Sequence, residues 1–166
     1  LANLLTLSRL LLVGPFAWFM LQPESEAAAW AALLLASAIV SDLLDGPLAR
    51  RAGRATAAGG AFDHTTDFLF VASGLVAGAW RGAWTWALPV LVCAAFAQYV
   101  ADSYLIHRAG TLRGNRLGRL NGILYFVPLC VDILARLGAA WLAPLIAPLA
   151  WLLVASTLVS MALRLR

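Results

Sequence analysis

The sequence predicts an all-α integral membrane protein with six transmembrane helices, both termini cytoplasmic and a polar active site near the cytoplasmic face. Hydrophobic residues fill 63% of the 166 positions and charged residues only 12%, roughly half the charged fraction of soluble domains. Each of six apolar segments comes close to the roughly 20 residues that cross a bilayer. We expect one domain over residues 1–166, built from Leu4–Leu21, Ala27–Leu44, Ala61–Trp80, Ala83–Leu105, Leu117–Leu137 and Trp141–Leu163.

Arginine is distributed unequally between the two ends of these segments. The end with few arginines holds Arg81 and Arg136, with Glu24 and Glu26. Because cytoplasmic loops are enriched in basic residues, we expect the arginine-rich end to face the cytoplasm, with the protein in the inner membrane of a bacterium. That end collects Arg9, Arg50, Arg51, Arg54, Arg108, Arg113, Arg116, Arg119, Arg164 and Arg166.

The first segment begins with a polar stripe. Asn3, Thr6 and Arg9 recur every three residues and share one face of an otherwise apolar helix. The segment lacks the small-residue cleavage site of a signal peptide, so we expect it to be a helix of the mature protein. Asn3 is also a residue type that caps helices.

Paired aspartates mark the end of the second segment and the start of the third. Asp42 and Asp45 stand three residues apart, and Asp63 and Asp67 stand four apart. Each spacing puts both members on one helix face, roughly 5 to 6 Å apart at Cβ. Crowded carboxylates need a counter-ion, and divalent cations prefer oxygen ligands. The pattern predicts a two-metal cluster, with unrelated helix-end aspartates facing water as the alternative.

The later segments carry few polar or small residues that suggest a function. Gly74 and Gly78 in the third segment form a pattern that permits close helix contact. In the fifth segment Asp132 and Arg136 are spaced for an i,i+4 ion pair. The sixth segment is predominantly apolar.

The stretch from Asp42 to Asp67 combines acidic, small and basic residues at fixed spacing. It reads Asp42-x-x-Asp45-Gly46-x-x-Ala49-Arg50, eight further residues, and Gly59-x-x-x-Asp63-x-x-x-Asp67. It matches without a gap the signature of the CDP-alcohol phosphotransferases, a family that the sequence therefore resembles. The resemblance implies a membrane enzyme of phospholipid synthesis that transfers a phosphatidyl group from CDP-diacylglycerol to a hydroxyl acceptor and releases CMP. The match rests on eight specified positions of this stretch.

The same resemblance implies roles for the four aspartates. Asp42, Asp45, Asp63 and Asp67 would hold divalent ions, two Mg²⁺ or Mn²⁺, against the pyrophosphate of the CDP-lipid. Asp67 resembles the general base of the family, which takes the proton of the acceptor hydroxyl. A carboxylate acts as a base only where it reaches that hydroxyl.

The resemblance also implies a binding site for the CDP-lipid. Small residues let the cytidine lie against two helix backbones, and an arginine suits a diphosphate, although that arginine also suits a simple cytoplasmic anchor. A threonine of the intervening turn and two residues of the first helix supply polar contacts. The predicted contacts are the small residues Gly46, Ala49 and Gly59, and the polar residues Arg50, Thr56, Asn3 and Thr6.

The acceptor is predicted from a basic cluster. Arg113, Arg116 and Arg119 repeat every three residues at the start of the fifth segment. Because arginine binds phosphate with two parallel hydrogen bonds, we expect a phosphorylated polyol such as glycerol 3-phosphate or inositol phosphate. The alternatives are a loop that faces lipid headgroups and an acceptor alcohol without phosphate. Asp102, near the end of the fourth segment, either borders the acceptor pocket or pairs with an arginine of the loop that follows.

A small cation transporter is the competing function from another class. It predicts acidic residues through the depth of several helices, whereas here they cluster at one level, and a scaffold protein has no use for them. From the family resemblance we further expect a homodimer in contact with membrane lipids. No nucleic-acid partner is expected.

Overall fold

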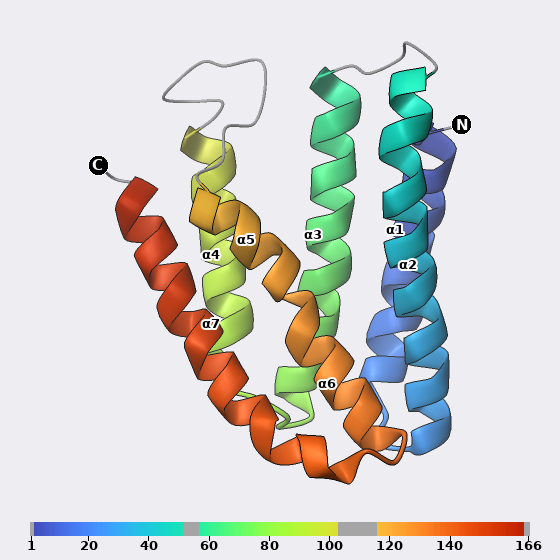
Figure 1. Cartoon of the computed structure of the whole chain (residues 1–166), viewed down its shortest axis with the longest axis vertical. Helices are drawn as coiled ribbons and strands as arrows, with labels where there is room; N and C mark the ends of the chain where they lie inside the picture. The colour runs from blue at the N-terminus through green and yellow to red at the C-terminus, as the bar shows by residue number, and fades with distance from the viewer. Residues whose placement is uncertain (1, 52–56, 103–115, 165–166) are drawn as a thin grey trace.

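The computed structural model describes residues 2–51, 57–102 and 116–164, and the side chains of 6–43, 59–102 and 116–164. Over these residues the chain is helical and forms no β-strand, so the all-α prediction is confirmed for them (Figure 1). The helices are α1 (Ala2–Leu21), α2 (Ser25–Arg51), α3 (Ala57–Trp80), α4 (Ala87–Ala101), α5 (Arg116–Leu124), α6 (Phe126–Arg136), the 3₁₀ helix η2 (Ala140–Leu142) and α7 (Ala143–Arg164).

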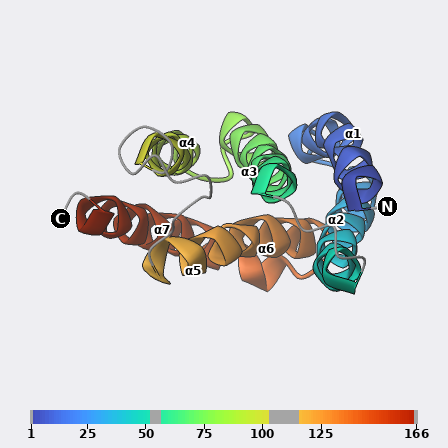
Figure 2. The same ribbon diagram turned by 90° about the horizontal axis from the view of Figure 1, so that it is seen from above.

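The helices form two rows, best seen from above (Figure 2). One row contains α4, α3 and α1, and the other contains α7, the pair α5 and α6, and α2. Helix α1 packs against both α2 and α3, while α6 packs against α2, α3 and α7. The start of α1, the end of α2, the start of α3 and the end of α7 lie at the same end of the bundle (Figure 1).

Length and composition identify a membrane protein. Large aliphatic and indole side chains are exposed on many of the helices, as expected for a surface that faces lipid rather than water. Among the described residues, three helices are long and apolar enough to cross a bilayer, and two other apolar helices, Thr6–Leu21 and Ala87–Ala101, are shorter than these three. The six-span count and the cytoplasmic termini stay predictions. The three described helices that are long enough are Ser25–Leu43, Arg116–Arg136 and Ala140–Arg164.

The second predicted segment continues as helix to Arg51 and the third begins at Ala57, and the fifth and fourth also differ from the observed helices. The fifth is divided at Tyr125 into α5 and α6, because Pro128 has no N–H to donate to the carbonyl of Leu124 and its ring crowds that turn. The fourth begins at Ala87 instead of Ala83. A tight turn precedes it, in which Gly82 has a φ of 82° that other residues rarely adopt.

The core is packed closely around the glycines of α3. Phe16 and Phe70 stack with their ring centroids 4.3 Å apart, and a Cβ built on Gly74 would lie 2.5 Å from the ring of Phe16. A Cβ on Gly78 would collide with the indole of Trp84. The small-residue pattern therefore serves helix packing within the chain, and these two faces are not free for a second copy.

A buried ion-pair network closes the end of the bundle opposite the aspartates. Asp132 is only 2% exposed and accepts from Arg81 at 2.5 Å. Arg136 lies 3.6 Å from the same carboxylate, which confirms the i,i+4 pair. Arg136 also donates to the carbonyls of Phe19 and Glu24, each at 3.2 Å. The network ties α3 and α6 to the turn between α1 and α2.

Candidate functional site

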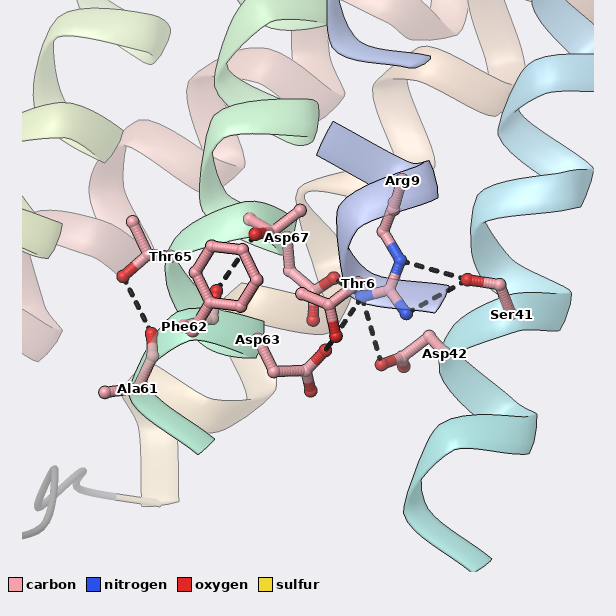
Figure 3. Close-up of polar contacts among 10 residues, drawn as sticks. Thr6, Arg9, Ser41, Asp42, Ala61, Phe62, Asp63, Thr65 and Asp67 are labelled. Atoms are coloured by element: carbon pink, nitrogen blue, oxygen red, sulfur yellow. Dashed lines mark hydrogen bonds and ion pairs between the residues drawn. The ribbon is translucent and has the colours of Figure 1, made fainter. Parts of the chain in front are cut away.

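Three of the four signature aspartates converge near the end of α2 and the start of α3 (Figure 3). Asp42 belongs to α2, and Asp63 and Asp67 lie one turn apart on α3. One carboxylate oxygen of each lies within 4.8 Å of the other two. Asp45 lies one turn beyond Asp42 in α2, and its side chain is outside the described part. Carboxylates from two separate helices thus form one cluster.

The cluster is open on one side. The side chain of Asp42 is 51% exposed, and those of Asp63 and Asp67 are 29% and 28% exposed. These carboxylates keep part of their surface accessible from outside the bundle, although they lie close to one another. A charged ligand can therefore reach them without unfolding the helices.

A buried arginine closes the other side of the cluster. Arg9 of α1 is 1% exposed. Its Nη1 lies 3.6 Å from Oδ1 of Asp42 and 3.2 Å from Oδ1 of Asp63, and it donates to Oδ1 of Asp67. Its Nε and Nη2 donate to Oγ of Ser41, at 3.2 and 3.1 Å. A single guanidinium thus joins side chains of three helices (Figure 3).

From the sequence no role in the site was predicted for Arg9, which was counted among the cytoplasmic arginines and placed in the polar stripe of the first segment. The available signal was the polar stripe, because Thr6 and Arg9 lie on the same face of α1. Thr6, which was predicted to contact substrate, donates its hydroxyl to Oδ1 of Asp63 at 3.4 Å and is 4% exposed. Thr6 and Arg9, the two residues of the stripe whose side chains are described, therefore face the aspartates.

The donor set suits a hard divalent cation. Mg²⁺ and similar ions bind carboxylate oxygens at about 2.0 to 2.6 Å, so two oxygens on one ion lie no more than about 5 Å apart. The separations of 4.8 Å or less in the cluster meet this limit. Oxygen ligands favour Mg²⁺ and Mn²⁺ over metals that prefer sulfur or imidazole.

Comparison with protein families identifies the chain. The family model of CDP-alcohol phosphatidyltransferases matches residues 1–162. The chain belongs to this family. The resemblance read from the aspartate signature is therefore confirmed, and the match extends through all the described helices up to Ala162. As a CDP-alcohol phosphatidyltransferase, the protein is an enzyme of a family that depends in general on divalent metals.

A curated relative is similar over most of the chain. The cardiolipin synthase (CMP-forming) of Streptomyces coelicolor is 33% identical over 156 residues, which cover 90% of this chain and 71% of that protein. The alignment is long enough to support a shared membrane fold and a shared class of reaction.

The predicted CDP-lipid contacts of this phosphatidyltransferase are only partly described. Gly59 is half-buried on α3, one turn before Asp63. Thr56 lies outside the described residues. The others lie in helical backbone whose side chains are not described: Asn3 in the first turn of α1, and Gly46, Ala49 and Arg50 near the end of α2.

Arg116 and Arg119, the two predicted acceptor residues that the structure describes, do not contact the aspartates. Arg116 and Arg119 are exposed at the start of α5, in the half of the bundle that holds the cluster (Figure 1). Within the described ranges α5 packs against α6 and α7 and makes no close approach to α2 or α3. Arg113 lies outside the described residues. Asp102 pairs with Arg164 at the end of α7, at 3.8 Å, whereas the predicted partner was an arginine of the loop that follows the fourth segment.

Proposed function

We propose that this phosphatidyltransferase transfers the phosphatidyl group of CDP-diacylglycerol to a hydroxyl of a phosphate-bearing polyol and releases CMP. The convergence of Asp42, Asp63 and Asp67 within 4.8 Å carries the proposal, because a pyrophosphate donor needs its negative charge neutralised at one point. The protein acts in the inner membrane of a bacterium, with this cluster facing the cytoplasm. It works as a homodimer in contact with membrane lipids.

The donor binds at the ends of α2 and α3. Asp42, Asp45, Asp63 and Asp67 would hold two Mg²⁺ or Mn²⁺ ions, whose positive charge would supply neutralisation of the diphosphate and of the leaving CMP. The small residues of the signature leave room for cytidine beside the two helix backbones, and the polar residues bind the diphosphate. These contacts are Gly46, Ala49 and Gly59, with Arg50, Thr56, Asn3 and Thr6.

Asp67 acts as the general base. The acceptor oxygen bonds to the β-phosphorus of the donor, the bond from that phosphorus to the oxygen of CMP breaks, and Asp67 takes the acceptor proton. One oxygen of Asp67 is held by Arg9, so the second oxygen is the one that faces the acceptor. The partial exposure of Asp67 supports this role.

The acceptor is a polyol with a phosphate that the arginines of α5 bind. Because cardiolipin contains two phosphatidyl groups on one glycerol, a synthase that forms it with release of CMP joins a phosphatidyl donor to phosphatidylglycerol. The similarity to such a synthase favours phosphatidylglycerol over glycerol 3-phosphate and inositol phosphate. Arg113, Arg116 and Arg119 suit the phosphate of each.

An acceptor panel tests this proposal. The purified protein, with CDP-diacylglycerol and Mg²⁺, is given phosphatidylglycerol, glycerol 3-phosphate, inositol phosphate, glycerol or inositol, and both CMP and lipid products are measured. We expect CMP and cardiolipin with phosphatidylglycerol. Product with a phosphate-free alcohol alone would refute the assigned role of the α5 arginines, and absence of CMP with every acceptor would refute the enzyme's proposed reaction.

A further inference from the structure

The aspartate cluster joins two helices that do not pack on each other. Within the described residues α2 and α3 make no close approach, and α1 packs against both. Arg9 of α1 is the side chain that reaches Asp42 on one helix and Asp63 and Asp67 on the other. The alignment of the two halves of the cluster therefore depends on a contact made by α1 (Figure 3).

The guanidinium is held in a fixed orientation. Nη1 approaches one oxygen of each of three aspartates, and the opposite edge of the group donates twice to Ser41. The side chain is 1% exposed, so it lies on the buried side of carboxylates that are accessible from the other. Its charge is permanent, because arginine is not deprotonated in proteins.

We infer that Arg9 is a positioning residue that draws the aspartates of α2 and α3 together and shares their oxygens with the divalent cations, so that it limits how tightly those cations bind. The inference rests on the proposed metal site. It adds to that site a protein-borne cation with two opposite effects. Arg9 stabilises the fold, and it weakens the binding of a second cation by the same three carboxylates.

The sign of the second effect follows from linkage. Arg9 is attracted most strongly to carboxylates that no other cation neutralises, so its contribution to stability is larger before a divalent ion binds than afterwards. By reciprocity, removal of the guanidinium must strengthen binding of the ion by the same factor. A residue that only supports the fold would instead leave metal affinity unchanged or weaken it.

The test measures Mn²⁺ binding by purified protein in detergent, with no substrate present, from the electron paramagnetic resonance signal of free Mn²⁺. For Arg9→Met we expect a lower melting temperature without metal, and a Kd for Mn²⁺ that falls about tenfold, within the usual range of coupling between sites. For Arg9→Lys, which keeps the charge, we expect a Kd close to that of the wild type. Ser41→Ala, which loosens the guanidinium, should give a smaller fall.

The matched control is Arg136→Met, which removes another buried arginine that bonds to a carboxylate and to backbone carbonyls, at the opposite end of the bundle. It should lower the melting temperature and leave the Kd for Mn²⁺ unchanged. Weaker or unaltered Mn²⁺ binding in Arg9→Met, or in Ser41→Ala if the first variant does not fold, overturns the inference. An equal change in Arg136→Met also overturns it. Wild-type protein that binds no Mn²⁺ refutes the metal site itself, a result distinct from the others.

Discussion

At the scale of single residues, the three described aspartates have the same functional group but differ in solvent exposure and in hydrogen-bond partners. Asp42 is half-exposed, whereas Asp63 and Asp67 are less so. Asp63 accepts from both Thr6 and Arg9, and Asp67 accepts from Arg9. Arg9 contacts one oxygen, Oδ1, of each carboxylate. The second oxygen of each can bind a cation or accept a hydrogen bond from a substrate hydroxyl.

We predict different defects for Asp63→Asn and Asp67→Asn. Loss of a metal ligand in Asp63→Asn should reduce CMP release by at least about 100-fold and weaken Mn²⁺ binding. Loss of the base in Asp67→Asn should reduce CMP release by about 10²- to 10⁴-fold. Initial rates with CDP-diacylglycerol and phosphatidylglycerol measure both effects.

Thr65→Ala is the control for these variants. Thr65 is exposed on the same helix and donates its hydroxyl to the carbonyl of Ala61, so the rate of Thr65→Ala should stay near that of the wild type. Full activity of Asp63→Asn would contradict the metal site. Full activity of Asp67→Asn would contradict the base.

At the scale of helices, α3 has two functions along its length. Its first half presents Asp63 and Asp67, and its second half presents Gly74 and Gly78 to large rings of α1 and of the α3–α4 turn. Gly74 permits the close approach of α1 through Phe16, and Arg9 of the same helix lies within reach of the aspartates. Packing in the middle of the bundle therefore determines the geometry of the site at its end.

We predict that Gly74→Ala destabilises the protein. The new methyl would crowd Phe16, and such overpacking costs typically about 1 to 3 kcal/mol. The melting temperature in detergent should fall, and activity should fall with it because α1 is displaced. Gly14→Ala, on a helix position with nothing within 4 Å, should leave the melting temperature almost unchanged; an equal fall there would contradict the packing argument.

At the scale of the whole molecule, the two ends of the bundle are closed by different means. At one end the carboxylate of Asp132 has counter-ions from the protein itself, since it is paired with Arg81 and Arg136. At the other end, three carboxylates surround the guanidinium of Arg9 within the described residues, and this excess of negative charge favours the binding of further cations. The stability of the whole fold should consequently depend on metal.

We predict that chelation lowers both activity and thermal stability. EDTA should abolish CMP release, and Mg²⁺ or Mn²⁺ should restore it. A cation at about 100 times its Kd should stabilise the fold by about 2.7 kcal/mol, seen as a higher melting temperature. Asp63→Asn should lose most of this increase. A wild-type melting temperature that does not respond to either ion would count against a bound metal.

Orientation is the second prediction at this scale. In a background with Cys93 and Cys130 changed to serine, a membrane-impermeant maleimide added to intact cells should label Glu26→Cys at the arginine-poor end. It should label Gly60→Cys, which is exposed near the aspartates, only after the membrane has been permeabilised. The reverse pattern would place the site on the outer face.

Much of this organisation was predictable because it depends on local spacing. The apolar segments predicted the helices, and the i,i+4 spacing of Asp63 and Asp67 predicted that these two share a face. The shared face of Asp42 and Asp45 stays a prediction. The bounds of the fourth and fifth segments were less accurate, since a glycine with positive φ and the ring of Pro128 act on single turns within otherwise uniform apolar runs. Periodicity does not reveal such local effects.

The sequence by itself determined the helical membrane class, the family and the aspartate signature, because composition and fixed spacing are properties of one stretch of chain. Only the tertiary structure decided that Arg9 lies between α2 and α3, that Gly74 and Gly78 face inward, and that Arg81 joins Asp132. Each of these contacts spans at least 50 positions or depends on how one helix rotates against another. That rotation is set by packing among all the helices, which no local pattern specifies.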